Sequence, residues 1–94
     1  MERFPADVRA DMLRVCAQYG ARKVRLFGSM ARGDAGASSD VDILVDFEPS
    51  RSLLDRVALT QDLEDLLGRK VQVVTEKALH WYIRDRILDQ AVPL

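Results

Sequence analysis

The segment that most restricts how this chain can fold is Asp40–Phe47, in which acidic and apolar residues alternate. In an extended strand, alternate side chains point to opposite faces, so one face of this segment carries only apolar residues. These are Val41, Ile43, Val45 and Phe47. The opposite face carries Leu44 and three aspartates, Asp40, Asp42 and Asp46. The pattern predicts a β-strand that packs one face on a core and leaves the other face for polar groups.

The segments around this strand read as alternating helices and strands. Apolar spacing, turn residues and caps predict helices over 5–19, 52–67 and 78–91, a short helical turn over 30–32, a loop over 33–39 and strands over 23–27 and 70–74. In the helix 52–67, the residues expected to face inward are Leu53, Val57, Leu63, Leu66 and Leu67. This order predicts one α/β domain over residues 1–94, with a sheet of at least three strands flanked by helices.

Composition excludes several classes of function. The 94 residues carry a net charge of −1, which argues against binding of nucleic acid through bulk charge. The one cysteine, Cys16, excludes an intrachain disulfide and a cysteine-rich zinc site, and its apolar surroundings favour a core position over a nucleophile. Neither a membrane span nor a signal peptide is apparent, so we expect a cytoplasmic protein.

Two short motifs offer groups suited to phosphate chemistry. Gly28-Ser29 follows the predicted strand 23–27, where a glycine lets backbone N–H groups approach phosphate oxygens and Ser29 adds a hydroxyl donor. Asp40 and Asp42 project from one strand face, roughly 7 Å apart, and can share Mg²⁺, which takes oxygen ligands. A solvated polar face is the alternative for the aspartates, since an isolated Asp-x-Asp is a weak signal.

The combined pattern, Gly28-Ser29 followed by Asp40-Val41-Asp42, resembles the active-site signature of the DNA polymerase β-like nucleotidyltransferase superfamily. The wider segments 26–33 and 39–45 are similar to its minimal nucleotidyltransferase branch, and the order of helices and the end of the chain agree with it. The resemblance implies a palm-like fold with a mixed sheet.

The same resemblance implies roles for individual residues. Gly28 and Ser29 would bind ATP or another nucleoside triphosphate, and Asp40 and Asp42 would be the catalytic residues that hold Mg²⁺. Arg32 lies one turn beyond Ser29 and is expected to reach a phosphate, with a solvated turn residue as the alternative.

The resemblance also implies a partner. Small proteins of this branch often act as antitoxins of HEPN-domain ribonuclease toxins, and the implied reaction transfers AMP from ATP to a tyrosine of the toxin. Two other functions stay open. The chain can neutralise the toxin by direct contact with a vestigial nucleotide site, or it can serve as a nucleotide-binding regulator.

One position departs from the family pattern. The superfamily has a third carboxylate on the strand after the long helix, and the matching position here is Gln72, which has no charge and cannot accept a proton as a base does. Glu76 is a possible substitute, although the entry to the last helix is the simpler interpretation of this residue. Gln72 therefore favours binding over turnover.

Other side chains suggest contacts with a partner. Trp81 and Tyr82 cannot both face inward on one helix, so the last helix is a candidate surface for homo- or hetero-oligomers. Arg22, Lys23 and Arg25 flank a strand, where they can attract ATP or RNA or keep a sheet edge from aggregating.

Overall fold

The computed structural model describes residues 4–33, 36 and 39–94. In chain order the elements are α1 (Ala6–Gln18), β1 (Ala21–Phe27), α2 (Ser29–Arg32), β2 (Val41–Phe47), α3 (Leu53–Leu67), β3 (Val71–Thr75), the 3-10 turn η1 (Glu76–Ala78), α4 (Trp81–Gln90) and β4 (Val92–Pro93). Positions 34, 35, 37 and 38 of the expected loop 33–39 lie outside the described residues.

Within the described chain, the strands form one four-stranded sheet in the order β3-β2-β1-β4. β1 pairs antiparallel with both β2 and β4, whereas β2 and β3 run parallel. The helix α3 makes the crossover that a parallel pair requires. The expected α/β fold, with a mixed sheet of at least three strands flanked by helices, is therefore confirmed.

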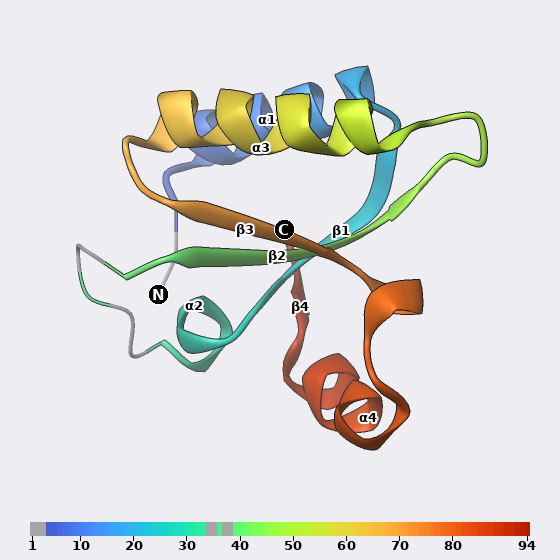
Figure 1. The fold of residues 1–94 in the computed structure, drawn as a ribbon. Helices are drawn as coiled ribbons and strands as arrows, with labels where there is room; N and C mark the ends of the chain where they lie inside the picture. The colour runs from blue at the N-terminus through green and yellow to red at the C-terminus, as the bar shows by residue number, and fades with distance from the viewer. Residues whose placement is uncertain (1–3, 34–35, 37–38) are drawn as a thin grey trace.

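The fourth strand was not expected from the sequence. Val92 and Pro93 pair with Leu26 and Arg25, and the N–H of Leu94 donates to the carbonyl of Val24 at 3.0 Å. Two residues are too few to show an alternating pattern, and a proline usually signals the end of an element. This short pairing returns the end of the chain to the sheet (Figure 1).

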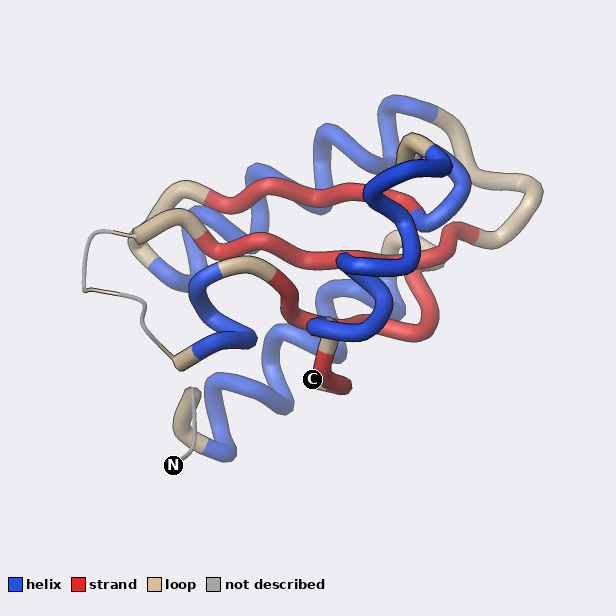
Figure 2. The backbone as a smooth tube through the Cα atoms, turned by 90° about the horizontal axis from the view of Figure 1, so that it is seen from below, coloured by secondary structure: helices blue, strands red, loops and turns tan. Residues whose placement is uncertain are grey.

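The helices cover the two faces of the sheet unequally. α1 and α3 lie side by side on one face, which we call the core face, and α2, η1 and α4 lie on the other, which we call the site face (Figure 1). Seen from below, α2 and α4 lie in front of the strands and the long helices lie behind them (Figure 2).

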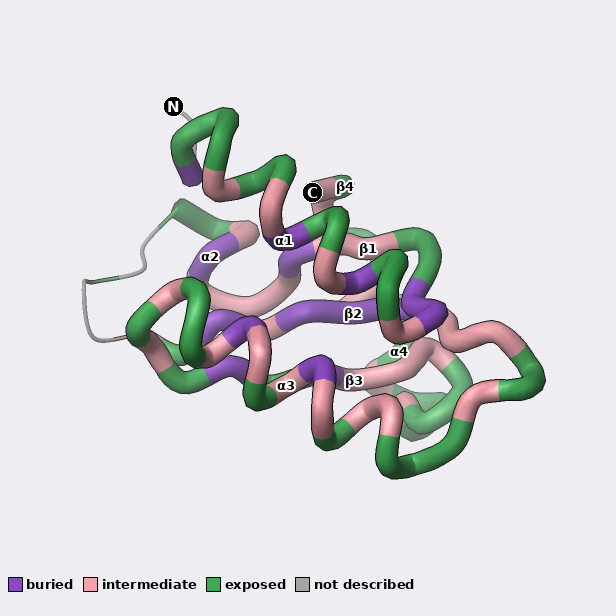
Figure 3. Tube along the Cα trace, turned by 90° about the horizontal axis from the view of Figure 1, so that it is seen from above, coloured by how far each residue is buried: buried purple, intermediate pink, exposed green. Residues whose placement is uncertain are grey.

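The hydrophobic core lies between the sheet and the pair α1 and α3, as the buried positions in Figure 3 show. Both helices and the strand β2 contribute fully buried side chains: Met12, Cys16, Ile43, Leu59 and Leu63. Burial raises the pKa of the Cys16 thiol to about 11, so the thiol stays protonated at neutral pH. The prediction that Cys16 is a core residue is confirmed.

The predicted inward face of α3 is partly wrong. Leu53, Val57 and Leu66 are exposed, with Leu53 at 71% of its full accessibility, whereas Leu59 and Leu63 are fully buried. Leucine and valine occur all around this helix, so their spacing does not select one face. The start of the helix agrees with the prediction, because the N–H of Ser52 donates to the Asp55 carboxylate at 2.9 Å in a capping box.

β1 is longer than predicted and contains an irregularity. Its pairing with β2 shifts by one residue between Arg22 and Arg25, and Lys23 has a positive φ of 53° within this bulge. Beyond the bulge, Phe27 is the register partner of Asp42. The bulge therefore sets which residues of β1 lie beside the aspartates.

In the part of the chain that the structure describes, no helix is long and apolar enough to cross a membrane.

Candidate active site

The turn between β1 and α2 has a backbone that only glycine adopts readily. Gly28 has φ 68° and ψ −145°, and its carbonyl accepts the N–H of Arg32 at 3.1 Å as α2 begins. A Cβ atom at this position would lie 2.5 Å from Oδ2 of Asp42. The backbone angles thus favour glycine at position 28, and a side chain there would displace the Asp42 carboxylate.

The structure brings the predicted site residues together at one end of the sheet. Asp42 lies opposite Phe27, next to the Gly28 turn, and Asp40 directly precedes β2. Ser29 and Arg32 are the first and last residues of α2, on the same face of the sheet. Gly28, Ser29, Arg32, Asp40 and Asp42 therefore form one cluster, although their chemical roles remain predictions.

The electrostatics of Asp42 reflect this cluster. Partial burial raises the pKa of the Asp42 carboxyl above its usual value, and the nearby negative charge of Asp40 raises it further. The positive charge of Arg32 acts in the opposite direction. A partly buried carboxylate next to a second negative charge is an arrangement that a bound cation would stabilise.

The donor set fits magnesium in one specific way. Among the described residues, no group of three or more acidic, histidine or cysteine side chains could hold a metal ion. Mg²⁺ is commonly bound through one or two carboxylates, with phosphate oxygens and water as its other ligands. Asp40 and Asp42 suit that mode of binding, in which the metal arrives with a nucleotide.

Gln72 lies on the strand beside Asp42. The parallel register of β2 and β3 makes Gln72 the Cα partner of Asp42, and Gln72 is exposed while its neighbours Val71 and Val73 are each only 4% exposed. Because neighbours in a sheet point to the same side, Gln72 lies on the face that carries Asp42. Whether this position replaces a third carboxylate stays a prediction.

Glu76 is not a substitute for that carboxylate. It begins η1, past the end of β3 far from Gln72, and it pairs with Arg25 at 3.3 Å and Arg84 at 3.0 Å. The hydrogen bond from Arg84 is the main cause of the lowered pKa of Glu76, with Arg25 contributing. Asp46 is also separate from the cluster, because it lies four residues beyond Asp42 on β2. The amino group of Lys23 lies 3.9 Å from its carboxylate.

One residue near the site was missed by sequence reasoning. Arg69, in the turn between α3 and β3, donates to the carbonyl of Ser39 at 2.5 and 3.1 Å and to that of Gly36 at 2.9 Å. These bonds hold the backbone that leads into Asp40. A single arginine in a turn gives no sequence signal for such a role, because its partners lie about thirty residues away.

Comparison with known proteins agrees with this geometry. Residues 12–94 match the family model described as a nucleotidyltransferase domain. A relative named protein adenylyltransferase MntA, from Thermococcus cleftensis, is 38% identical over 98% of this chain and 93% of its own length.

Solved structures give the same result. One described as a candidate minimal nucleotidyltransferase has 44% identity and a TM-score of 0.82, and the match covers 100% of this chain and 97% of that one. A crystal structure of a toxin-antitoxin with AMP-PNP shares the fold at 21% identity and a TM-score of 0.76, over 89% of this chain and 69% of the other.

The turn at Gly28, the paired aspartates, the mixed sheet and these matches agree: the chain belongs to the minimal nucleotidyltransferases of the nucleotidyltransferase domain family.

Proposed function

We propose that this chain is a Mg²⁺-dependent adenylyltransferase that moves AMP from ATP to a tyrosine of a HEPN ribonuclease toxin and so neutralises it. The observation that carries the proposal is the contact between the Gly28 turn and Asp42, where a Cβ atom would collide with the carboxylate. A nucleotide polyphosphate can then lie against backbone N–H groups and metal-binding oxygens at once.

The reaction assigns a part to each residue of the cluster. The acceptor oxygen attacks the α-phosphorus of ATP, the bond to pyrophosphate breaks, and the acceptor proton passes to solvent or a nearby base. Gly28 and Ser29 position the phosphates, and Arg32 offsets their negative charge. Asp40 and Asp42 would hold Mg²⁺, which when bound stabilises the charge that develops on the phosphate oxygens.

The names of similar proteins support the choice of reaction and partner. The relative from Thermococcus cleftensis is named for protein adenylyl transfer, and a structure of the same fold is a toxin-antitoxin with AMP-PNP. The name of that relative favours transfer of AMP over other ATP-dependent modifications of a protein acceptor.

A second candidate is neutralisation of the toxin by contact alone. Gln72 is the observation that favours it, because the residue beside Asp42 is an amide that cannot act as a base. On this alternative the nucleotide site binds ATP without turnover.

The decisive experiment incubates the purified chain with the protein encoded by the adjacent reading frame, Mg²⁺ and ATP labelled at the α-phosphate. We expect the label on the neighbouring protein, at a tyrosine found by mass spectrometry. The variant Asp42→Asn should lose transfer by about a thousandfold or more, since it removes a metal ligand. Chelation of the metal should have the same effect.

The alternative predicts a different set of results. Without label transfer, and with Asp42→Asn neutralising the ribonuclease as well as the parent chain, the enzymatic proposal is wrong and the contact model holds. The variant Gln72→Glu refines the choice. A large gain in transfer rate would show that the missing carboxylate limits turnover.

A further inference from the structure

A concave feature lies at the other end of the sheet from Gly28. It is a pocket of about 480 Å³ between β1, the end of β2 and η1, with α4 on one side. Its charged lining residues are Arg22, Lys23, Asp46, Glu76, Lys77 and Arg84. This volume lies in the usual range for pockets that receive a ligand group.

The charges in this basic pocket do not cancel. Four cationic and two acidic side chains line it, which leaves two positive charges in excess, whereas the whole chain has a net charge of −1. Lys23 lies near Asp46, and Arg84 pairs with Glu76. Among the described residues, Arg22 and Lys77 make no ion pair, and both are exposed.

The pocket opens on the site face, which also carries the cluster of Gly28 and Asp42. Asp46 and Asp42 lie on the same side of β2, four residues apart, which corresponds to about 13 Å along a strand. An ordinary protein interface covers about 800 Å² on each partner, a patch about 30 Å across. A protein whose side chain reaches Asp42 would therefore also cover the pocket.

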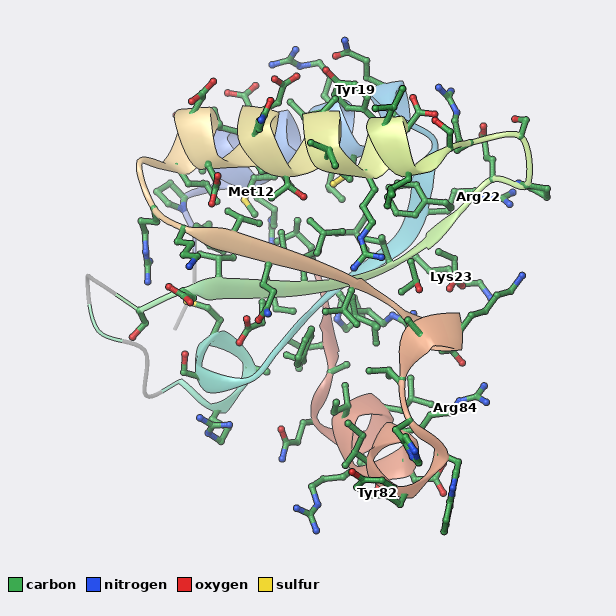
Figure 4. All side chains as sticks on the ribbon, in the orientation of Figure 1. Met12, Tyr19, Arg22, Lys23, Tyr82 and Arg84 are labelled. Atoms are coloured by element: carbon green, nitrogen blue, oxygen red, sulfur yellow. The ribbon has the colours of Figure 1, made fainter. Side chains whose placement is uncertain are left out.

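An aromatic cluster lies at the start of α4, one helical turn before Arg84, which lines the pocket. Trp81 is 80% exposed and Tyr82 is 65% exposed, and their ring centroids lie 5.8 Å apart in an edge-to-face arrangement. Their helix projects from the site face, with Tyr82 pointing away from the sheet (Figure 4). No residue of α4, all of which are described, is buried. Exposed tryptophan and tyrosine are the residues that most often dominate binding energy at interfaces.

We propose that the basic pocket and the aromatic cluster of Trp81 and Tyr82 form one docking surface for an acidic face of the protein that accepts AMP. The inference rests on the proposed function, since it names where that protein substrate binds. Acidic side chains of the partner pair with Arg22 and Lys77, and an apolar patch beside them covers Trp81. The interface places the acceptor tyrosine over Asp42.

The observations favour a protein over RNA as the occupant. Asp46 and Glu76 lie within the pocket, where they would repel a continuous phosphate backbone. The chain as a whole is slightly acidic, unlike domains that bind nucleic acid through their charge. A protein face with a few carboxylates next to apolar groups matches both the charge and the aromatic rings.

Calorimetric titration tests the proposal, with the protein encoded by the adjacent reading frame as the probe. We expect the double variant Arg22→Glu, Lys77→Glu to weaken binding by about tenfold or more, with a smaller dependence on salt. The matched control Arg9→Glu, Arg14→Glu makes the same change of charge on exposed positions of α1 and should alter the Kd less than about twofold.

A spectroscopic measurement on the unmutated chain covers the case in which the double variant does not fold. Trp81 is the only tryptophan, so 5-fluorotryptophan labelling gives one ¹⁹F signal. Binding of the partner should shift this signal. An unshifted signal in a saturated complex, or equal affinity of the double variant and the control, would overturn the proposal.

Two further arms separate this proposal from its rivals. If the double variant loses affinity for a single-stranded RNA probe but binds the partner normally, the pocket is an RNA site and the proposal is wrong. Binding that depends on the pocket but yields no AMP transfer would refute the proposed function and leave the docking surface intact. AMP transfer that does not depend on the pocket would refute the docking surface and leave the proposed function intact.

Discussion

The two faces of the sheet differ in what they bury. Toward α1 and α3, Met12, Leu59 and Leu63 have no exposed surface and form a continuous core. Toward α2 and α4, the sheet presents Asp42 and the ion pairs of Glu76, and α4 contributes no buried residue. Hydrophobic burial is thus concentrated on the core face, while the site face retains charge.

This division explains how a small chain can carry two repelling carboxylates. Their repulsion lowers the free energy of unfolding, but the core that offsets it lies on the other side of β2 and does not depend on their geometry. Substitutions on the core face should therefore change stability, and those on the site face should change binding. The predictions below test this separation, from the largest expected effect to the smallest.

The largest effect is expected from Leu63→Ala on the core face. Leu63 is fully buried, and its truncation leaves a cavity that should lower the free energy of unfolding by about 2–5 kcal/mol. Urea unfolding measures this loss. The affinity of the remaining folded protein for a fluorescent ATP analogue should change less than about twofold. A parallel loss of nucleotide affinity would show that the two faces are coupled.

Gly28→Ala should have the opposite effect, a loss of nucleotide affinity that exceeds its effect on stability. The added Cβ would meet Oδ2 of Asp42, so we expect nucleotide affinity to fall roughly 10- to 100-fold, or about 1.4–2.7 kcal/mol. Gly68→Ala is the matched control, because Gly68 also has a positive φ, of 64°, but no atom lies within 4 Å of its would-be Cβ. Similar nucleotide affinities for the two variants would mean that the contact with Asp42 is unimportant.

A smaller effect on the site face is expected from Arg69→Ala. Without its bonds to the Ser39 and Gly36 carbonyls, the backbone before Asp40 loses its support, and Mg²⁺-dependent nucleotide affinity should fall about 5- to 10-fold. Arg56→Ala is the matched control. It breaks a comparable hydrogen bond, from Arg56 to the carbonyl of Val73 in β3 at 2.7 Å. If Arg56→Ala weakens nucleotide binding equally, the effect of Arg69 is one of general stability.

The sequence predicted those features that depend on local order. The alternation in Asp40–Phe47 identifies a strand and its two faces, and Gly28-Ser29 identifies a turn, because both signals lie within a few neighbouring residues. The family pattern then relates the two motifs across the loop. These local signals and the family pattern together were enough to predict which residues form the cluster at one end of the sheet.

Features that depend on distant contacts could not be predicted. The inward side of α3 depends on how the helix is rotated on the sheet, and leucines on all sides do not encode that rotation. Arg69 and Glu76 find their partners far along the chain, at Ser39 and Arg25, and long charged side chains are compatible with many partners. β4 depends on pairing rather than on propensity.

The smallest effect is expected from Glu76→Gln, which tests whether the ion pairs on the site face add to the free energy of unfolding. Hydrogen bonds from Arg84 and Arg25 lower the pKa of Glu76 below its ordinary value of 4.5, so its ionised form stabilises the folded state. That contribution is complete above pH 4.5 and is lost as the pH falls through the lower pKa of the folded protein. Glu76→Gln should therefore unfold more easily than the parent at pH 7, with the difference shrinking in acid.

Asp11→Asn is the control for this change, since it removes the exposed pair with Arg14 on α1, where one partner is 69% exposed and water screens the interaction. Thermal unfolding of both variants between pH 7 and pH 3 makes the comparison. If Glu76→Gln follows the parent at every pH, the ion pairs that join β1, η1 and α4 add nothing to folding. The position of α4 would then depend on its half-buried apolar residues, Ile83, Ile87 and Leu88, and on its connections to η1 and β4.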